Sequence, residues 1–363
     1  MTYEKLYKTQ YEITSDEYKQ YLTTIKEAYR KAYKDTNSLL KATYAKLSDV
    51  AQEDYYNELI KFNRYEKLLA KIESDYKQAV KVSHKAVKDG CELSANNMFY
   101  RSTYSAEWAG ELLFLPVDEN VISASVTGSI NTWKDITDNK KWAGTLPQNG
   151  TLSELFNNNA TQDLQKIRST LTTALINGQS YTNTAKQIRE VLNSGAYKSL
   201  RIARTEGNRA LNNGSYIQGK EAELQDVNVT KMWDTTFDVR TRQTHANADK
   251  QERGLDDNFN VGSAVGLFPC QMSQAKESIN CRCSSTNLVN GMRPEVKRAR
   301  NPVKEIQWQN ATATERKNRM LKDGTKIYPR SEQTDIIQNR SFNEWASLNN
   351  LKYDKTGRIV YEG

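Results

Sequence analysis

Cysteine and histidine are scarce in this chain, whose 363 residues include four cysteines and two histidines. Four cysteines are too few for a disulfide scaffold at this length, so we expect reduced thiols or thiolates on a metal. The sequence also lacks a run of about 18 apolar residues, the length that spans a bilayer. Its first residues lack the basic-then-apolar pattern of a signal peptide. We therefore expect a protein that stays in the compartment where it is made and has no membrane partner.

Glycine and proline are absent from the first 89 residues. Both interrupt helices, so their absence predicts long helices that end at Asp89-Gly90. Twelve of the 20 tyrosines lie in this region, many of them three or four residues apart. An apolar ring with a polar tip suits half-buried seams and protein interfaces. We predict an α-helical docking region over residues 1–90, although ordinary helix packing explains the same stripes.

Residues 91–159 have a mixed pattern with short strand-like apolar runs, and we predict a connecting region there. Three helices are predicted next from apolar periodicity. The first ends at Asn177-Gly178, the second at Gly195, and the third runs from about residue 196 to 220 with a face of small residues. Alternation over residues 227–233 then predicts a strand.

Residues 233–283 contain one of the two histidines and three of the four cysteines. Imidazole and thiolate are the ligands that zinc prefers, and four of them close a tetrahedral structural site. His245, Cys270, Cys281 and Cys283 are the candidate ligands. Asp249, four residues after His245, is an alternative ligand or a residue that orients the imidazole. A buried histidine with thiols that pack as small apolar groups fits the same residues.

Four charged residues are candidates for structural ion pairs, because a planar guanidinium binds two carboxylate oxygens at once. They are Arg204, Glu206, Asp238 and Arg240. Catalysis is not indicated, since the sequence has no His-Glu-x-x-His, no Gly-x-Ser-x-Gly and no phosphate-binding Gly-rich loop. A hydrolytic zinc site would also need an open coordination position and a base, for which Glu252 is the only nearby candidate. We therefore expect a protein without enzymatic activity.

Basic residues are concentrated near the end of the chain. The formal net charge is +8. Residues 1–89 contribute +3, residues 90–290 contribute −1 and residues 291–363 contribute +6. A basic segment of this kind suits a polyanionic partner, and a solubilising surface explains it equally well. The candidates for contacts to phosphates are Arg298, Arg300, Arg316, Lys317 and Arg319.

A series of short motifs follows in a fixed order along residues 160–290. They are Ile202-Ala203-Arg204-Thr205-Glu206, a strand into Trp233, Asp238-Val239-Arg240, His245, Leu267-Phe268-Pro269 and Glu277-Ser278-Ile279-Asn280-Cys281-Arg282-Cys283. In this order they resemble the phage head-morphogenesis family, the Mu F-like minor head proteins. Ser341-Phe342-Asn343-Glu344-Trp345 resembles the family's C-terminal end. The chain departs from the family where Cys270 replaces a glycine and Asp249-Lys250 replaces an Asp-Gly pair.

The resemblance implies a minor structural protein of a tailed-phage head, found in the virion after assembly in the host cytoplasm. It implies contacts with the portal protein, other head proteins or packaged double-stranded DNA. We predict an α+β, mainly α fold: long N-terminal helices, a small Mu F-like domain over residues 160–290 and an extended basic arm with short helices over residues 291–363. Two alternatives remain open. One is a metal-dependent nuclease or transferase carried in the capsid, and the other is a DNA-binding protein that organises the genome.

Overall fold

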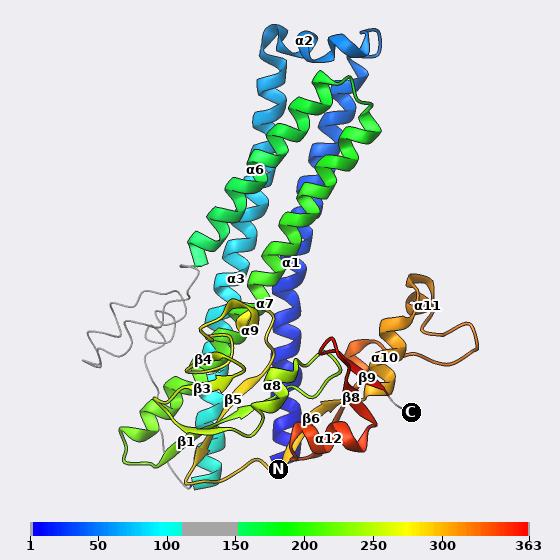
Figure 1. Ribbon diagram of the computed structural model, residues 1–363. Helices are drawn as coiled ribbons and strands as arrows, with labels where there is room; N and C mark the ends of the chain where they lie inside the picture. The colour runs from blue at the N-terminus through cyan, green and yellow to red at the C-terminus, as the bar shows by residue number, and fades with distance from the viewer. Residues whose placement is uncertain (1–2, 111–151, 362–363) are drawn as a thin grey trace. The chain divides into compact units, whose positions relative to one another are not determined.

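The chain consists of long helices followed by short antiparallel strands and small helices (Figure 1). A computed structural model describes residues 3–110 and 152–361. The predicted mainly α fold class with some β structure is confirmed. The chain divides into a helical unit, Ile13–Ser94 with Glu119–Gly207, and a mixed unit, Met1–Glu12 with Ala95–Asp118 and Asn208–Gly363.

Long helices make up most of the described part of the helical unit. They are α1 (Tyr3–Ala45), α3 (Arg64–Gly110), α6 (Leu152–Ile176) and α7 (Tyr181–Glu223). Between α1 and α3 lie three short elements, η1 (Gln52–Asp54), α2 (Tyr55–Ile60) and η2 (Lys61–Asn63). The prediction of long helices from the missing glycine and proline is therefore confirmed. The strand-like runs predicted between residues 112 and 126 lie outside the described residues.

Two glycines that were expected to end helices lie inside them instead. Helix α3 continues through Gly90, and α7 continues through Gly195, so the second and third predicted helices are one. The reason is close packing. A Cβ added to Gly90 would lie 2.9 Å from the ring of Tyr21, and one on Gly195 would lie 2.9 Å from the Tyr76 hydroxyl. Glycine inside a helix is about 1 kcal/mol less favourable than alanine, but at each of these positions it lets a tyrosine approach the backbone.

Gly178, by contrast, ends α6 as the sequence predicted. Its φ is +58°, the left-handed conformation that glycine adopts without strain. The Gly178 amide donates to the Leu175 carbonyl at 3.2 Å, and the Gln179 amide donates to the Ala174 carbonyl at 2.8 Å. These two bonds satisfy carbonyls that the end of a helix leaves unpaired.

Several tyrosines of the predicted stripes are used to pack the helices. Tyr29 and Tyr76 are buried and form an edge-to-face pair with ring centroids 6.0 Å apart. The Tyr76 hydroxyl donates to the buried carboxylate of Asp163 at 2.8 Å, and Lys198 of α7 donates to the same carboxylate at 2.6 Å. These contacts favour the packing interpretation of the stripes over a surface dedicated to docking.

The mixed unit is built on a three-stranded antiparallel sheet. Its order is β2 (Glu252–Gly254), β1 (Val229–Asp234) and β5 (Ser284–Val289), with Trp233 opposite Ser285. The strand predicted over residues 227–233 is thus confirmed as β1. The segments between these strands contain α8 (Gln243–Asn247), β3 (Phe259–Val261), β4 (Ala264–Gly266) and α9 (Ala275–Ser278).

The small-residue face predicted for the third helix lies in the last part of α7. There a Cβ added to Gly214 would lie 2.2 Å from the Ala95 carbonyl oxygen of α3. Outside this face but on the same helix, a Cβ on Gly219 would meet the Leu255 side chain at 2.9 Å. The small residues therefore allow another backbone and a core side chain to approach this helix closely.

The C-terminal segment is folded rather than extended, which corrects the predicted arm. It contains β6 (Val296–Arg300), α10 (Pro302–Asn310), α11 (Ala313–Asn318), η4 (Arg330–Glu332), β7 (Thr334–Gln338), α12 (Phe342–Leu348), β8 (Leu351–Tyr353) and β9 (Ile359–Tyr361). Strand β6 pairs with β7, and β8 pairs with β9.

Aromatic burial explains why this segment folds back. The rings of Phe342 and Trp345 lie 5.4 and 5.2 Å from the ring of Phe237. Lys297 of β6 is buried, and its ammonium donates to the Asp234 carboxylate at 2.6 Å. The helix predicted around residues 341–345 is confirmed as α12, whose start is a reciprocal capping box between Ser341 and Glu344.

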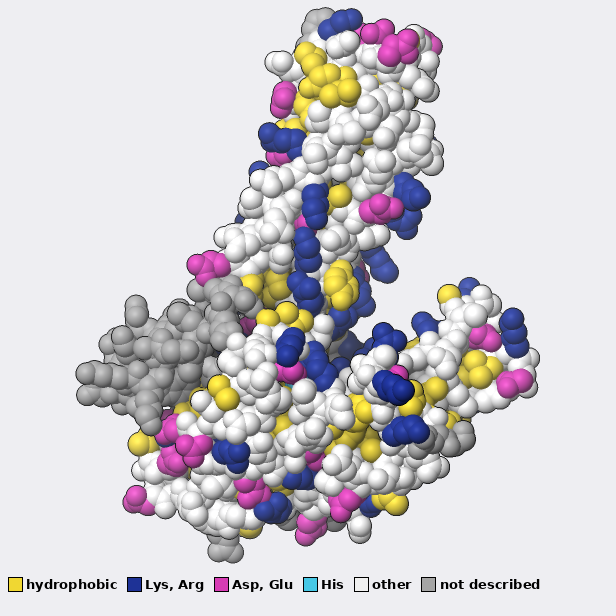
Figure 2. All heavy atoms as spheres, viewed as in Figure 1, with side chains coloured by type: hydrophobic (Ala, Val, Ile, Leu, Met, Phe, Trp, Pro, Cys, Tyr) yellow, Lys and Arg dark blue, Asp and Glu magenta, His cyan; other side chains and the backbone are white. Residues whose placement is uncertain are grey.

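Within the described residues, none of the helices combines the length and apolar character needed to cross a membrane. On the face seen in Figure 2, lysine and arginine side chains are interspersed with aspartate and glutamate over both units. This mixed distribution is typical of a solvated surface.

Candidate metal centre

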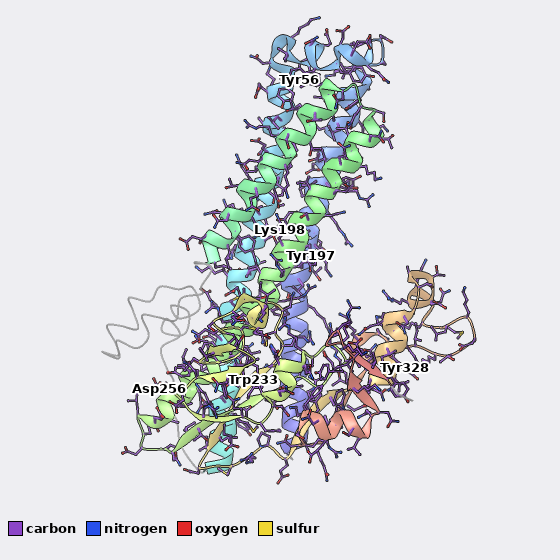
Figure 3. The ribbon with its side chains drawn as sticks, in the orientation of Figure 1. Tyr56, Tyr197, Lys198, Trp233, Asp256 and Tyr328 are labelled. Atoms are coloured by element: carbon purple, nitrogen blue, oxygen red, sulfur yellow. The ribbon has the colours of Figure 1, made fainter. Side chains whose placement is uncertain are left out.

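His245 lies on the short helix α8, in the interior of the mixed unit. The residue is 2% exposed. Its ring packs edge-to-face on Trp233 of β1, which is labelled in Figure 3, with ring centroids 5.6 Å apart. The Thr235 hydroxyl donates to the His245 carbonyl at 2.7 Å. The end of β1 thus holds both the ring and the backbone of the histidine.

Cys281 and Cys283 lie in the loop between α9 and β5, and both are buried. Asn208 of α7 donates to the carbonyls of Cys281 and Cys283 at 3.2 and 2.9 Å. Asn212, one turn further along α7, accepts the Ser285 amide at 2.6 Å. These two asparagines fix the loop, and the sequence reasoning missed their role. The available signal was an asparagine pair four residues apart on α7, a spacing that places both side chains on one face of the helix.

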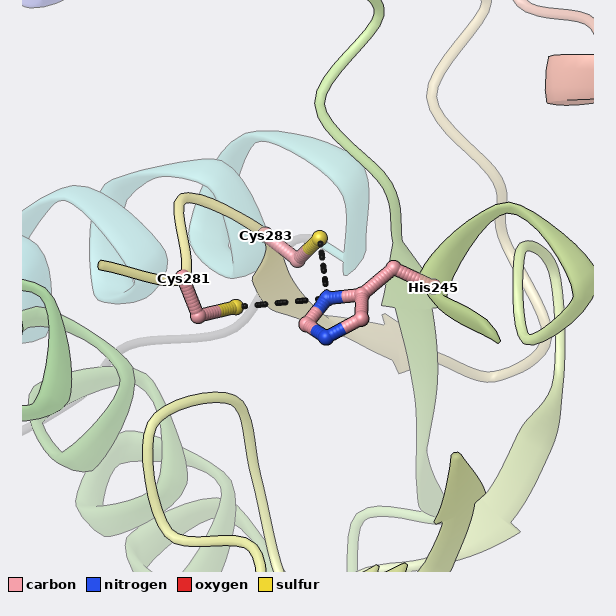
Figure 4. A group of neighbouring side chains, drawn as sticks. All are labelled: His245, Cys281 and Cys283. Atoms are coloured by element: carbon pink, nitrogen blue, oxygen red, sulfur yellow. Dashed lines mark hydrogen bonds between the residues drawn. The ribbon is translucent and has the colours of Figure 1, made fainter. Parts of the chain in front are cut away.

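The imidazole of His245 points one nitrogen at both sulfurs (Figure 4). Nδ1 lies 3.4 Å from the Cys283 Sγ and 3.6 Å from the Cys281 Sγ. The three ligand atoms all lie within 4.8 Å of one another. A nitrogen and two sulfurs at this spacing are donors of the kind that zinc binds, one fewer than the four that close a structural site.

The other ring nitrogen, Nε2, faces the buried carboxylate of Glu277, with Oε2 at 3.0 Å. The Thr244 hydroxyl donates to the same oxygen at 3.0 Å. Arg242 places Nη1 3.2 Å from Nε2 and donates through Nη2 to the Ile279 carbonyl at 2.6 Å. Glu277 was quoted only as part of a motif, so its contact with the histidine was missed. Its position four residues before Cys281 was the signal.

Burial raises the pKa of the Cys281 and Cys283 thiols above its ordinary value. Desolvation of the thiolate is the main cause in both. Without a cation the pair is therefore protonated at neutral pH. A bound metal reverses this preference, because a coordinating thiol is deprotonated outright.

Comparison with known proteins identifies the region that contains these residues. The family model described as "Phage Mu protein F like protein" matches residues 165–286. The chain is 27% identical over 252 residues to minor head protein GP7 of Bacillus phage SPP1. The aligned region covers 68% of this chain and 75% of that protein. Residues 165–286 thus form a Mu F-like region, and the chain is similar to a phage minor head protein.

A second similar protein is named as a transferase. Over 134 residues the chain is 32% identical to the NAD(+)–arginine ADP-ribosyltransferase EFV of Enterococcus faecalis (strain ATCC 700802 / V583). That match covers 37% of this chain and only 28% of the enterococcal protein. No solved structure matches the chain.

Cys270 and Asp249 lie outside the group of three ligand atoms in the Mu F-like region. The Cys270 Sγ is buried, 3.5 Å from the Cys281 carbonyl oxygen, and accepts a hydrogen bond from Asn208 at 3.4 Å. Asp249 accepts the backbone amides of Thr235 at 2.9 Å and Phe342 at 2.7 Å. The structure thus uses Asp249 to join α12 to β1 and does not bring it to His245.

Asp238 is the centre of a buried ion-pair cluster. Its carboxylate lies 3.1 Å from Arg240 Nη2 and 2.8 Å from Arg282 Nη2. Arg240 also pairs through Nε with Glu305 of α10 at 3.1 Å. Burial alone would raise the pKa of Asp238, but the charges of Arg282 and Arg240 outweigh it and lower the pKa. Because Arg282 stands between the two cysteines, this cluster also positions the loop that presents the thiols.

Arg204 and Glu206 are not brought together in the same way. Arg204 is exposed and Glu206 is buried. Residues two apart on a helix point to different faces, so these two side chains of α7 do not face each other. The ion-pair partners missed by the sequence are Arg282 and Glu305, which lie far along the chain from Asp238.

The five basic candidates in the C-terminal segment are distributed over β6, α11 and the residue that ends α11. Arg298 and Arg300 are half-buried on β6, and Arg300 donates to Gln333 at 3.4 Å. Arg316 donates to the carbonyls of Trp308 and Gln309 at the end of α10, at 2.9 and 2.7 Å. Arg319 pairs with Glu332 at 3.0 Å. These bonds hold the segment together, although Arg316 and Arg319 are exposed, as Lys317 is.

Proposed function

We propose that this protein is an assembly component of a tailed-phage head that binds the portal protein and acts without catalysis. The observation that carries the proposal is the similarity to minor head protein GP7, which extends over 252 residues. That length is well beyond the 165–286 region that the family model matches. The similarity therefore includes helices outside the Mu F-like region, as expected for a shared role of the whole chain.

The buried position of the His245 group supports a non-catalytic role. His245, Cys281 and Cys283 are each at most 3% exposed, so a substrate has no route to them without local opening. The transferase relative does not alter this proposal, because the match covers only 28% of that protein. Transferase activity is therefore tested separately, by incubating the chain with NAD⁺ and arginine-rich protein; we expect no incorporation.

Portal binding is tested by mixing the purified full chain with purified portal rings of the same phage and separating complexes by size. We expect the chain to co-elute with the ring. As a matched control, the major capsid protein of the same phage is mixed with the chain under identical conditions. Failure to co-elute at micromolar concentrations of both proteins would contradict the proposed binding to the portal protein.

A contact with packaged DNA through the C-terminal segment is the second candidate, favoured by the +6 charge of residues 291–363. Such contacts are independent of sequence and weaken as salt rises. Arg316, Lys317 and Arg319 are all exposed, but Arg316 and Arg319 also bond within the segment, which makes Lys317 the simplest residue to substitute. We expect Lys317→Glu to weaken binding to double-stranded DNA at low salt. Absence of binding by the wild-type chain at low salt would eliminate this candidate.

A further inference from the structure

The His245 group has the spacing of a tetrahedral zinc site. With Zn–S of about 2.3 Å and Zn–N of about 2.0–2.1 Å, neighbouring nitrogen and sulfur ligands of a tetrahedral ion lie about 3.6 Å apart. The two observed nitrogen–sulfur distances are 3.4 and 3.6 Å. We propose that His245 Nδ1, Cys281 Sγ and Cys283 Sγ bind one Zn²⁺ ion that locks this part of the fold.

The surroundings of the imidazole are suited to that role. A histidine that ligates a metal through one nitrogen usually donates its other N–H to a carboxylate, which sets the tautomer and the ring orientation. Glu277 Oε2 lies 3.0 Å from Nε2 and is itself held by Thr244. With the proton on Nε2, the lone pair of Nδ1 points at the two sulfurs.

A metal-free arrangement is the competing explanation. If Nδ1 carries the proton, it donates to a cysteine sulfur, and Nε2 accepts from Arg242 at 3.2 Å. In that tautomer the group is a buried hydrogen-bonded cluster with neutral thiols. The two arrangements differ in whether zinc is present, so a direct metal measurement separates them.

Cys270 is the nearest further thiol and the fourth ligand that we would test. Closed structural zinc sites have four protein ligands. Cys270 is buried in the same apolar cluster as Cys281 and Cys283, although its sulfur lies outside the group of three. The proposal rests on His245, Cys281 and Cys283. Counting the sulfur ligands of the bound ion shows whether Cys270 is the fourth ligand.

Zinc would join two parts of the chain that regular structure holds weakly. His245 belongs to a helix of five residues, and the cysteines belong to a loop between a four-residue helix and β5. The ion would close the chain between residues 245 and 281. Metal binding of this kind contributes directly to folding free energy.

The test is metal analysis of the full chain purified without chelators from zinc-supplied cells, with Cys281→Ser and Cys91→Ser as variants. Cys91 is also a buried cysteine but belongs to α3, so its variant is the matched control. We expect about one zinc per chain in the wild type and in Cys91→Ser, and loss of zinc in Cys281→Ser. A wild-type chain without zinc, or equal zinc in all three, overturns the proposal.

X-ray absorption at the zinc edge keeps the proposal testable if Cys281→Ser does not fold. We expect the wild-type spectrum to contain one nitrogen with two or three sulfurs at about 2.3 Å. Three sulfurs would assign Cys270 as the fourth ligand, and two would leave the fourth position to another donor. A shell made only of nitrogen and oxygen would exclude the cysteines and so overturn the site.

Discussion

Asp238 offers the sharpest test of how the loop that carries the cysteines is held. Its side chain is fully buried and accepts from Arg240, Arg282 and Thr241, the last at 3.2 Å. Asp238→Asn keeps the shape but turns an NH₂ group toward donors. Breaking a buried ion pair destabilises a protein by about 3–5 kcal/mol. Because Arg240 and Arg282 are 30% and 36% exposed, water partly compensates for the lost charge, so we expect about 2–3 kcal/mol.

The assay is urea unfolding followed by tryptophan emission, because Trp233 and Trp345 are buried in the mixed unit. Asp226→Asn is the matched control; that side chain is exposed, and we expect a change within about 0.5 kcal/mol. The pKa of Asp238 is lowered in the folded state. Its stabilisation is therefore complete above the unfolded pKa of about 3.9 and is lost as the pH falls through the folded pKa.

The difference between the wild type and Asp238→Asn should accordingly be constant from pH 5 to 7 and shrink below about pH 4. A loss of less than about 1 kcal/mol at pH 7 would refute the assignment of Asp238 as the charged centre of the cluster. A difference that does not change with pH would refute the ionised state.

Four further substitutions test other contacts. Glu277→Gln should weaken zinc about 10- to 100-fold in chelator competition while leaving portal co-elution unchanged; unchanged zinc affinity would remove Glu277 as the residue that orients His245. Gly214→Ala should lower the melting temperature by several degrees, because its Cβ would lie 2.2 Å from the Ala95 carbonyl oxygen. Gly207→Ala, whose Cβ would meet only the end of the Tyr18 side chain at 2.6 Å, should be milder; equal effects would contradict the close backbone approach. Burial lowers the pKa of Lys231 to about 7, so between about pH 7 and 10 the unfolded chain binds more protons and stability should rise with pH. In Lys231→Met this rise should be absent, and an identical pH profile would show that Lys231 titrates normally.

The long helices and the strand β1 were predictable because their signals are local. Missing glycine and proline predicted α1 and α3, and alternation predicted the strand into Trp233. The roles of the glycines were not predictable in the same way. Gly178 ends a helix through a positive φ, whereas Gly90 and Gly195 make room for tyrosines that come from distant parts of the chain. A single sequence does not distinguish these two uses.

The candidate site was predicted in part for a similar reason. His245, Cys281 and Cys283 belong to scarce residue types, and their concentration in one window indicated a shared site. Glu277 and Asn208 belong to common types, and only the fold brings them to the imidazole and the loop carbonyls. Asp249 was a reasonable alternative ligand by spacing, but its carboxylate is occupied by backbone amides of two other segments.

Deletion of the gene from a phage that carries it tests the proposed role in the head most directly. Particles are purified from lysates of the deletion and of a complemented strain, and capsid dimensions, DNA content and infectivity are measured on the same preparations. We expect capsids of normal shape whose infectivity falls and is restored by the wild-type gene in trans. Fully infectious particles without the protein would contradict a structural role in the head.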